Sequence, residues 1–172
     1  MPGSTALPIA YVLLRILVVL NLLSGVAIFA LLTATIVARD WTMTALGIAP
    51  GSAIPAVLPG LQAVAALGIL AVLFNHAILK RLLAMIVTVG RGDPFVADNA
   101  YRLQAIAWAL LALQLISLAI AAIGRAISTK ELPVALDAGF SATGWLAVIL
   151  TFVLARVFAE GTLMREDLEG TI

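Results

Sequence analysis

The sequence predicts an all-α integral membrane protein with four transmembrane helices, arranged as two hairpins with both chain ends inside. Three observations predict this fold class. The 172 residues are 63% hydrophobic and 11% charged, whereas soluble domains are about 25% charged. The apolar residues gather into four runs that are long enough to cross a bilayer. The connection between the second and third runs, residues 80–102, is the most basic segment of the chain.

The first predicted span covers residues 16–38, which form 23 residues without a charge. This corresponds to about 35 Å of helix, enough to cross the hydrocarbon core. Arg15 at its start and Tyr11 one turn earlier are typical interfacial residues. No Lys or Arg precedes Arg15, so we expect a retained span rather than a signal peptide. The prolines and glycines of residues 40–60 predict no long helix there.

The second predicted span covers residues 61–79 and ends at Lys80 and Arg81. Beyond it, apolar residues recur at helical spacing, which predicts that the helix continues as an amphipathic extension (Leu82, Met85, Ile86 and Val89). Gly92 permits a turn with positive φ, and the Asp93-Pro94 pair restricts the geometry of that turn.

The third predicted span covers residues 103–123, with Asp98 as the predicted N-cap of its helix. A short outer loop with Arg125, Lys130, Pro133 and Asp137 follows. The fourth predicted span covers residues 140–158, and residues 159–172 are predicted to form a cytoplasmic tail. Residues 1–172 are interpreted as one domain.

The distribution of Lys and Arg predicts the orientation. With the connecting segment 80–102 inside, the inner ends carry seven basic residues, namely Arg15, Lys80, Arg81, Arg91, Arg102, Arg156 and Arg165. The outer ends carry three, namely Arg39, Arg125 and Lys130. Basic residues concentrate on the cytoplasmic side of membrane proteins, so both termini are predicted to be cytoplasmic.

A stripe of small residues follows the fourth span at intervals of four, namely Gly139, Thr143, Ala147, Thr151, Ala155 and Ala159. Small residues allow helix backbones to approach closely in a membrane. We expect the stripe to pack within the helical bundle. The alternative is a homo-oligomer interface.

Six polar or amphipathic side chains would lie at about one depth near the inner interface: Asn21, Asn75, His76, Gln104, Trp108 and Thr151. Intramembrane polar groups usually face the bundle interior and bond to one another. A structural hydrogen-bonded layer is one interpretation. An inward-facing polar pocket, in which His76 would titrate, is the other.

The composition argues against several function classes. The chain has no cysteine and one histidine, so we expect no metal site and no cofactor. The predicted spans contain no acidic residue, which argues against ion-coupled transport and against acid–base catalysis. The net charge of +1 leaves no basic stripe for nucleic acid. We therefore expect a protein that is not an enzyme and that has no catalytic residues.

The two predicted cytoplasmic segments carry opposite charge. Residues 160–172 have four acidic residues against Arg165, a net charge of −3, and residues 80–102 have four basic against two acidic residues, a net charge of +2. Such segments attract each other within about 8 Å. The alternative is a solvated tail. The candidate partner surface comprises Arg91, Asp93, Pro94, Phe95, Asn99, Arg102, Arg165, Glu166 and Asp167.

Two motifs resemble a known family. The first comprises Gly92, Pro94, Phe95, Asn99 and Leu103, and the second comprises Phe158, Gly161, Leu163, Asp167, Thr171 and Ile172. Together they resemble the bacterial membrane family catalogued as domain of unknown function 2975, in which Tyr101 would usually be basic. The resemblance implies four spans and, as a partner, a cytoplasmic helix-turn-helix regulator of the Cro/repressor type. It implies no activity.

These observations leave two function hypotheses. The first is a binding or regulatory protein of the bacterial inner membrane whose cytoplasmic face engages a soluble partner. The alternative is a small transporter or channel that uses the inward-facing polar pocket.

Overall fold

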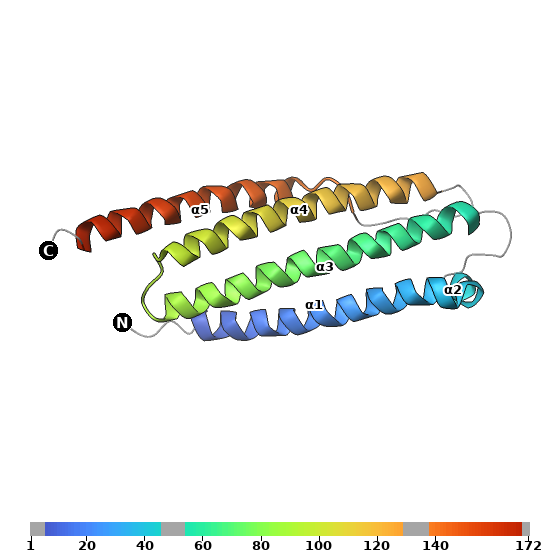
Figure 1. Cartoon of the computed structure of the whole chain (residues 1–172), viewed down its shortest axis with the longest axis horizontal. Helices are drawn as coiled ribbons and strands as arrows, with labels where there is room; N and C mark the ends of the chain where they lie inside the picture. The colour runs from blue at the N-terminus through green and yellow to red at the C-terminus, as the bar shows by residue number, and fades with distance from the viewer. Residues whose placement is uncertain (1–5, 46–53, 129–137, 170–172) are drawn as a thin grey trace.

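The computed structural model describes residues 6–45, 54–128 and 138–169, and all regular secondary structure in these ranges is α-helical. The helices are α1 (Ala6–Val37), α2 (Arg39–Ala45), α3 (Ile54–Gly90), α4 (Ala97–Ile127) and α5 (Ala142–Glu169). The four long helices run alternately in opposite directions, and the short α2 follows α1 (Figure 1). The start of α1, the α3–α4 turn and the end of α5 therefore lie at the same end of the molecule.

Four helices are long and apolar enough to cross a membrane. Their apolar stretches are Leu7–Val37, Val57–Gly90, Ala97–Ile127 and Ala142–Arg165. About 20 residues suffice to cross a hydrocarbon core of about 30 Å, and each stretch exceeds this length. The chain is a helical, multi-pass membrane protein, which confirms the all-α class and the presence of four membrane-crossing helices.

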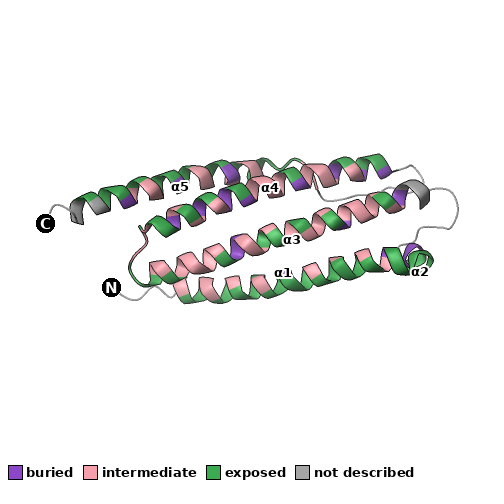
Figure 2. Cartoon of the chain, viewed as in Figure 1, coloured by how far each residue is buried: buried purple, intermediate pink, exposed green. Residues whose placement is uncertain are grey.

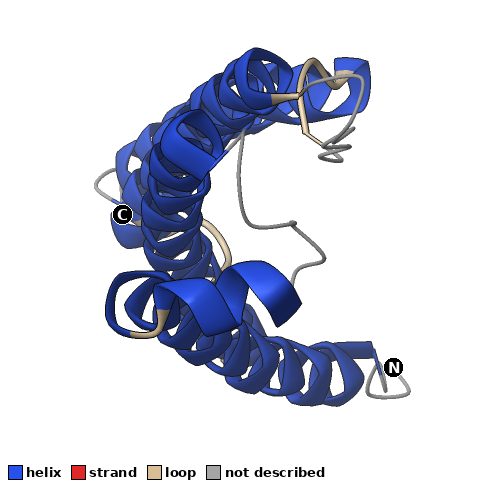
Figure 3. Cartoon of the chain, turned by 90° about the vertical axis from the view of Figure 1, so that its right-hand side faces the viewer, coloured by secondary structure: helices blue, strands red, loops and turns tan. Residues whose placement is uncertain are grey.

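The long helices pack in sequence order as an open arc. α1 contacts α3, α3 contacts α4, and α4 contacts α5, whereas within the described ranges α1 contacts neither α4 nor α5. Figure 3 shows the arc from one end. α1 and α5 are thus the edges of the row. The inner helix α4 buries nine residues, whereas α1 is largely exposed (Figure 2).

The exposed surface of α1 is apolar. It includes Leu13, Leu17, Leu20, Val26 and Phe29. In water such a surface would be unfavourable, but lipid tails are as apolar as these side chains. The exposure of α1 is therefore compatible with a bilayer as its solvent.

Glycines bring α1 and α3 close together. A Cβ atom on Gly25 would lie 2.9 Å from Val72 Cγ1, and a Cβ atom on Gly68 would lie 3.5 Å from Ile28. At the same contact, Asn21 Nδ2 donates to the Val72 carbonyl at 3.1 Å. Close packing and one interhelical hydrogen bond therefore hold α1 on α3.

The inner contacts combine an apolar cluster with two polar side chains of α4. Ile78 of α3 forms a buried cluster with Ile106 and Ala109 of α4. Toward the other end of α4, Gln114 lies directly against Gly144, where any side chain would collide with the amide. Ser117 Oγ accepts from the Gly139 amide at 3.0 Å and lies 3.1 Å from the Gly139 carbonyl. Together these contacts fix the start of α5 along α4.

Helix α3 begins earlier than the sequence predicts. It starts at Ile54 rather than near residue 61, and it includes Pro55 and Pro59. A proline in the first turn loses no helical hydrogen bond because the first amides have no helical partner. Pro59 is the sixth residue, so only the last proline of the segment removes a donor from the ladder. The predicted amphipathic extension to Val89 is confirmed.

Helix α5 continues to Glu169, so residues 159–169 are helical rather than a separate tail. Good helix formers predominate in this segment. Asp98 is not the N-cap of α4: Val96 is the N-cap, it makes no side-chain capping bond, and Asp98 lies in the first turn. A carboxylate there still interacts favourably with the N-terminal helix dipole.

The small-residue stripe of α5 lies only partly in the interface. Ala155 is buried, and Ala147, Thr151 and Ala159 are half-buried, but Thr143 is exposed. Gly144 and Val148 face α4 instead, because 3.6 residues per turn rotate a stripe of four-residue steps around the helix. The predicted outer loops lie mostly in residues 46–53 and 129–137, outside the described residues.

Candidate functional site

A glycine turn ends α3. The Asp93 amide donates to the Thr88 carbonyl at 3.2 Å, and the Gly92 amide donates to the Val89 carbonyl at 3.0 Å. These two bonds, with Gly92 at φ +84°, form a Schellman motif. Only glycine adopts this backbone conformation without strain. The positive φ predicted at Gly92 is confirmed. Pro94 comes directly after Asp93, the last residue of the motif.

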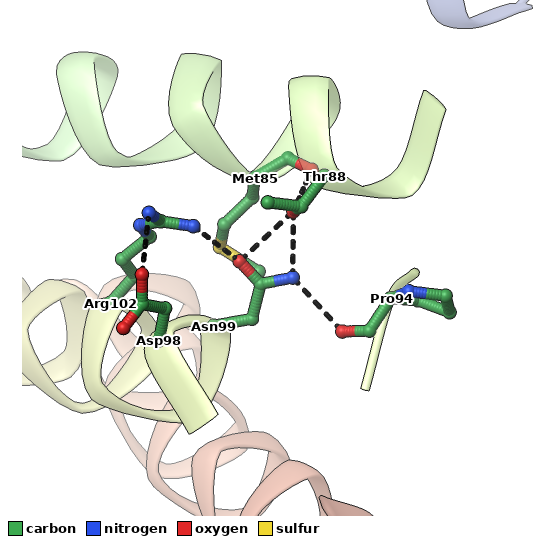
Figure 4. Close-up of polar contacts among 6 residues, drawn as sticks. All are labelled: Met85, Thr88, Pro94, Asp98, Asn99 and Arg102. Atoms are coloured by element: carbon green, nitrogen blue, oxygen red, sulfur yellow. Dashed lines mark hydrogen bonds and ion pairs between the residues drawn. The ribbon is translucent and has the colours of Figure 1, made fainter. Parts of the chain in front are cut away.

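Asn99 is the centre of a polar network that joins the turn to both helices. Its side chain is fully buried, with 0% exposure. Nδ2 donates to Thr88 Oγ1 at 2.8 Å and to the Pro94 carbonyl at 2.9 Å. Arg102 Nη1 donates to Asn99 Oδ1 at 2.8 Å (Figure 4). One amide thus bonds to α3, to the turn and to α4.

The network leaves no unsatisfied proton on its central groups. Thr88 Oγ1 accepts from Asn99 and donates to the Met85 carbonyl at 2.8 Å. Both Nδ2 protons of Asn99 are used, and Arg102 extends to Asp98 Oδ2 at 3.3 Å. A fully satisfied buried network favours one arrangement of the chain, because any unpaired member is costly.

The end of α5 packs on the same turn. The Phe95 ring lies 5.2 Å from the Phe158 ring, and a Cβ atom on Gly161 would lie 2.9 Å from Phe95 Cδ1. Arg165 forms an ion pair with Asp93. We call this region, residues 85–102 and 156–169, the turn end. Here α5 runs past the α3–α4 turn and is joined to it by ring packing and by charge.

The nine candidate surface residues separate into three groups. Arg91, Asp93, Pro94, Phe95, Arg165 and Asp167 are exposed or half-buried. Asn99 is buried and does not belong to the surface, because its amide is used inside the network; Arg102, with a side chain 25% exposed, is largely used there too. The side chain of Glu166 lies outside the described residues.

The six candidates for the polar layer lie in different surroundings. Asn21 bonds to α3, Thr151 Oγ1 donates to the Ala147 carbonyl of its own helix, and Asn75 is exposed. His76 Nδ1 is buried without a hydrogen-bond partner among the described residues. None of these bonds joins one candidate to another, so the bonds do not form a single layer.

The remaining two candidates, Gln104 and Trp108, lie on α4 beside α5. Gln104 is exposed, and the Trp108 ring meets the Phe152 ring edge-on at 5.3 Å. Near these residues lies a groove of about 400 Å³ between α4 and α5. We call it the α4–α5 groove; it is lined by Ala97, Ala100, Tyr101, Gln104, Phe152, Ala155, Arg156, Ala159, Thr162 and Leu163.

Sequence reasoning did not identify Thr88 or the α4 alanines of the α4–α5 groove, whereas Ala155 and Ala159 belong to the predicted small-residue stripe. Thr88 is a polar residue within an otherwise apolar extension, and this interruption was the available signal. The alanines of α4 gave no signal, because Ala97 and Ala100 look like ordinary helix residues until α5 lies beside them. Within the described residues, no cluster of three or more His, Cys, Asp or Glu side chains could hold a metal ion.

Comparisons with known proteins add no relative: no family model, no curated protein and no solved structure matches the chain.

Proposed function

We propose that this chain is a non-catalytic binding or regulatory protein of the bacterial inner membrane. Its turn end would face the cytoplasm and engage a soluble protein. The proposed topology is four spans in two hairpins, with both termini inside. The seven-to-three distribution of basic residues supports this orientation.

The observation that carries the proposal is the docking of α5 on the α3–α4 turn. Asp93 and Arg165 are 72 residues apart in sequence, and they pair across two elements that both extend beyond the predicted spans. Phe95 on Gly161 adds an apolar contact beside the pair. A charged surface made of two segments is suited to recognition of a protein partner.

The surface also has parts that are exposed to solvent. Phe95 is 42% exposed in spite of its ring contact, and Arg91 is exposed. The Asp93 and Arg165 side chains are 46% and 44% exposed. Aromatic and arginine side chains are enriched in protein interfaces. A helix-turn-helix regulator is the partner we propose, on the strength of the family resemblance alone.

The deciding experiment compares partner recovery from membranes that contain equal amounts of each variant. Removing residues 165–172 should leave the protein inserted while abolishing recovery of the soluble partner. Asp93→Arg and Arg165→Asp should each reduce recovery, and the double exchange should restore it, because it recreates the pair in the opposite sense. Each single exchange should change stability by no more than about 1 kcal/mol, since the pair is partly solvated.

Equal recovery with the intact and shortened chains would contradict the proposal and would favour the transport alternative. The orientation has its own test. Reporter fusions after Gly92 should read cytoplasmic and those near Gly51 external, and an external signal after Gly92 would overturn the topology.

A further inference from the structure

The α4–α5 groove changes in polarity along its length. Its walls carry alanines from both helices, namely Ala97, Ala100, Ala155 and Ala159. Phe152 lies at one end, beside Trp108. Tyr101, Gln104 and Arg156 line the same groove with polar groups, and Tyr101 is 70% exposed. Phe152 and Ala155 therefore form an apolar end of the groove, a polar edge of Gln104, Arg156 and Tyr101 follows toward the turn end, and the other three alanines lie level with this edge or beyond it.

The register of the two helices places this polar edge near the membrane interface. Trp108 and Phe152 are in contact, so they lie at one level. Arg102 lies six residues from Trp108, and Arg156 lies four residues from Phe152, about 9 and 6 Å in the same direction. Between Arg102 and Arg125, α4 spans about 35 Å, close to the thickness of a hydrocarbon core.

Arg156 is available for an anion at this depth. Its side chain is 79% exposed, and it pairs with Glu160 on the adjacent turn. A guanidinium has five donors, so one carboxylate does not exhaust it. Arginine also binds phosphate through two parallel hydrogen bonds. Tyrosine and tryptophan are enriched at the same depth in membrane proteins.

We propose that the α4–α5 groove is a phospholipid-binding site. The phosphate would bind Arg156 beside Tyr101 and Gln104, the rest of the headgroup would lie over Ala100 and Ala159 toward the turn end, and one acyl chain would run past Ala155 and Phe152 into the hydrocarbon. A soluble protein cannot match this site, because the end near Phe152 lies within the hydrocarbon. The groove volume of about 400 Å³ is within the range of small-molecule sites. The proposal does not depend on a soluble partner or on the orientation of the chain.

The test is native mass spectrometry of the full chain in detergent, titrated with phosphatidylglycerol. Arg156→Gln combined with Glu160→Gln keeps the net charge and should weaken binding of the first lipid at least five-fold. Glu160→Gln alone should not weaken it. Arg125→Gln removes an exposed arginine at the far end of α4 and should leave the first binding event unchanged.

A second set of variants tests the alanine-lined part of the groove that lies beyond Arg156 toward the turn end. Ala159→Leu and Ala100→Leu should each weaken the first lipid at least five-fold by filling the groove. The melting temperature of each variant is also measured without lipid, so that loss of fold can be told apart from loss of binding. The Arg156→Gln and Glu160→Gln changes lie on an exposed surface, so this double variant remains decisive if both alanine variants unfold.

Three results would overturn the proposal. The first is equal binding by the Arg156/Glu160 double variant and the wild type. The second is equal loss of binding in Arg125→Gln, which indicates non-specific lipid around the protein. The third is a dimer that Ala159→Leu dissociates while lipid binding is unchanged, which would assign the groove to a second copy of the chain.

Discussion

Two asparagines show how differently the two regions of this molecule are held together. Asn99, at the turn end, is fully buried and has bonds to Thr88, to the Pro94 carbonyl and to Arg102. Asn21, in the α1–α3 contact, is 8% exposed and bonds to one backbone carbonyl. The first anchors a network of side chains, whereas the second adds one bond to a contact made by shape.

The difference follows from the surroundings of each contact. Near the end of the helices the chain must turn, and turns leave backbone groups that need partners. Within the span, backbone groups are satisfied by the helix itself, and apolar side chains gain little by leaving lipid. Close approach through Gly25 and Gly68 then determines where α1 sits on α3.

The largest expected effect is at Asn99. Asn99→Leu should lower the free energy of unfolding by about 2–3 kcal/mol, because it leaves Thr88, the Pro94 carbonyl and Arg102 without a shared partner. SDS-induced unfolding in mixed micelles measures this change. Asn75→Leu is the control, because Asn75 is exposed. A loss below about 0.5 kcal/mol at Asn99 would contradict the importance of the network.

A smaller effect is expected at Gly25. Gly25→Leu should lower the free energy of unfolding by about 1–2 kcal/mol, because it separates α1 from Val72. The control is Ala27→Leu, on the exposed face of α1. Cross-linking of cysteines placed on α1 and α3 would report the separation directly. Unchanged unfolding and cross-linking would mean that α1 does not depend on this close approach.

The smallest effect is expected at Asn21. Asn21→Val should cost about 0.6 kcal/mol, the average for an interhelical hydrogen bond within a membrane protein. Ser24→Val is matched to it, because the Ser24 hydroxyl donates to the Leu20 carbonyl of its own helix. The same SDS titration compares the two. If Asn21→Val costs as much as Asn99→Leu, the two regions do not differ as described.

The sequence predicted the parts of this fold that depend on apolar length and on one backbone conformation. Four long apolar runs gave four helices, and Gly92 gave the positive φ at the end of α3. It placed the start of α3 too late, because Pro55 was treated as a breaker although a proline in the first turn is tolerated. It also treated residues 159–172 as a tail, whereas α5 continues to Glu169 and packs through Gly161 against Phe95.

The candidate site was predicted in outline. The acidic tail and the basic segment 80–102 were expected to attract each other; the observed ion pair joins the acidic Asp93 of the turn to the basic Arg165 of α5, which is the opposite sense. The role of Asn99 depends on burial, which a single sequence does not contain, so it was placed on the surface. The α4–α5 groove depends on how far α5 is shifted along α4, that is, on the axial register of these two consecutive helices. Ser117 and Gly139 set that register, and no local pattern in the sequence encodes it.

The open arc has a consequence for how the chain assembles. Each long helix contacts only the long helices adjacent to it in sequence, within the described residues. The contact of α1 with α3 can therefore form before α4 has been synthesised, and the Asn99 network can close before α5 arrives. Local contacts of this kind favour rapid folding, and domains begin to fold from the N-terminus during synthesis. Biogenesis can thus proceed in the order of translation, with each new helix joining a surface that is already complete.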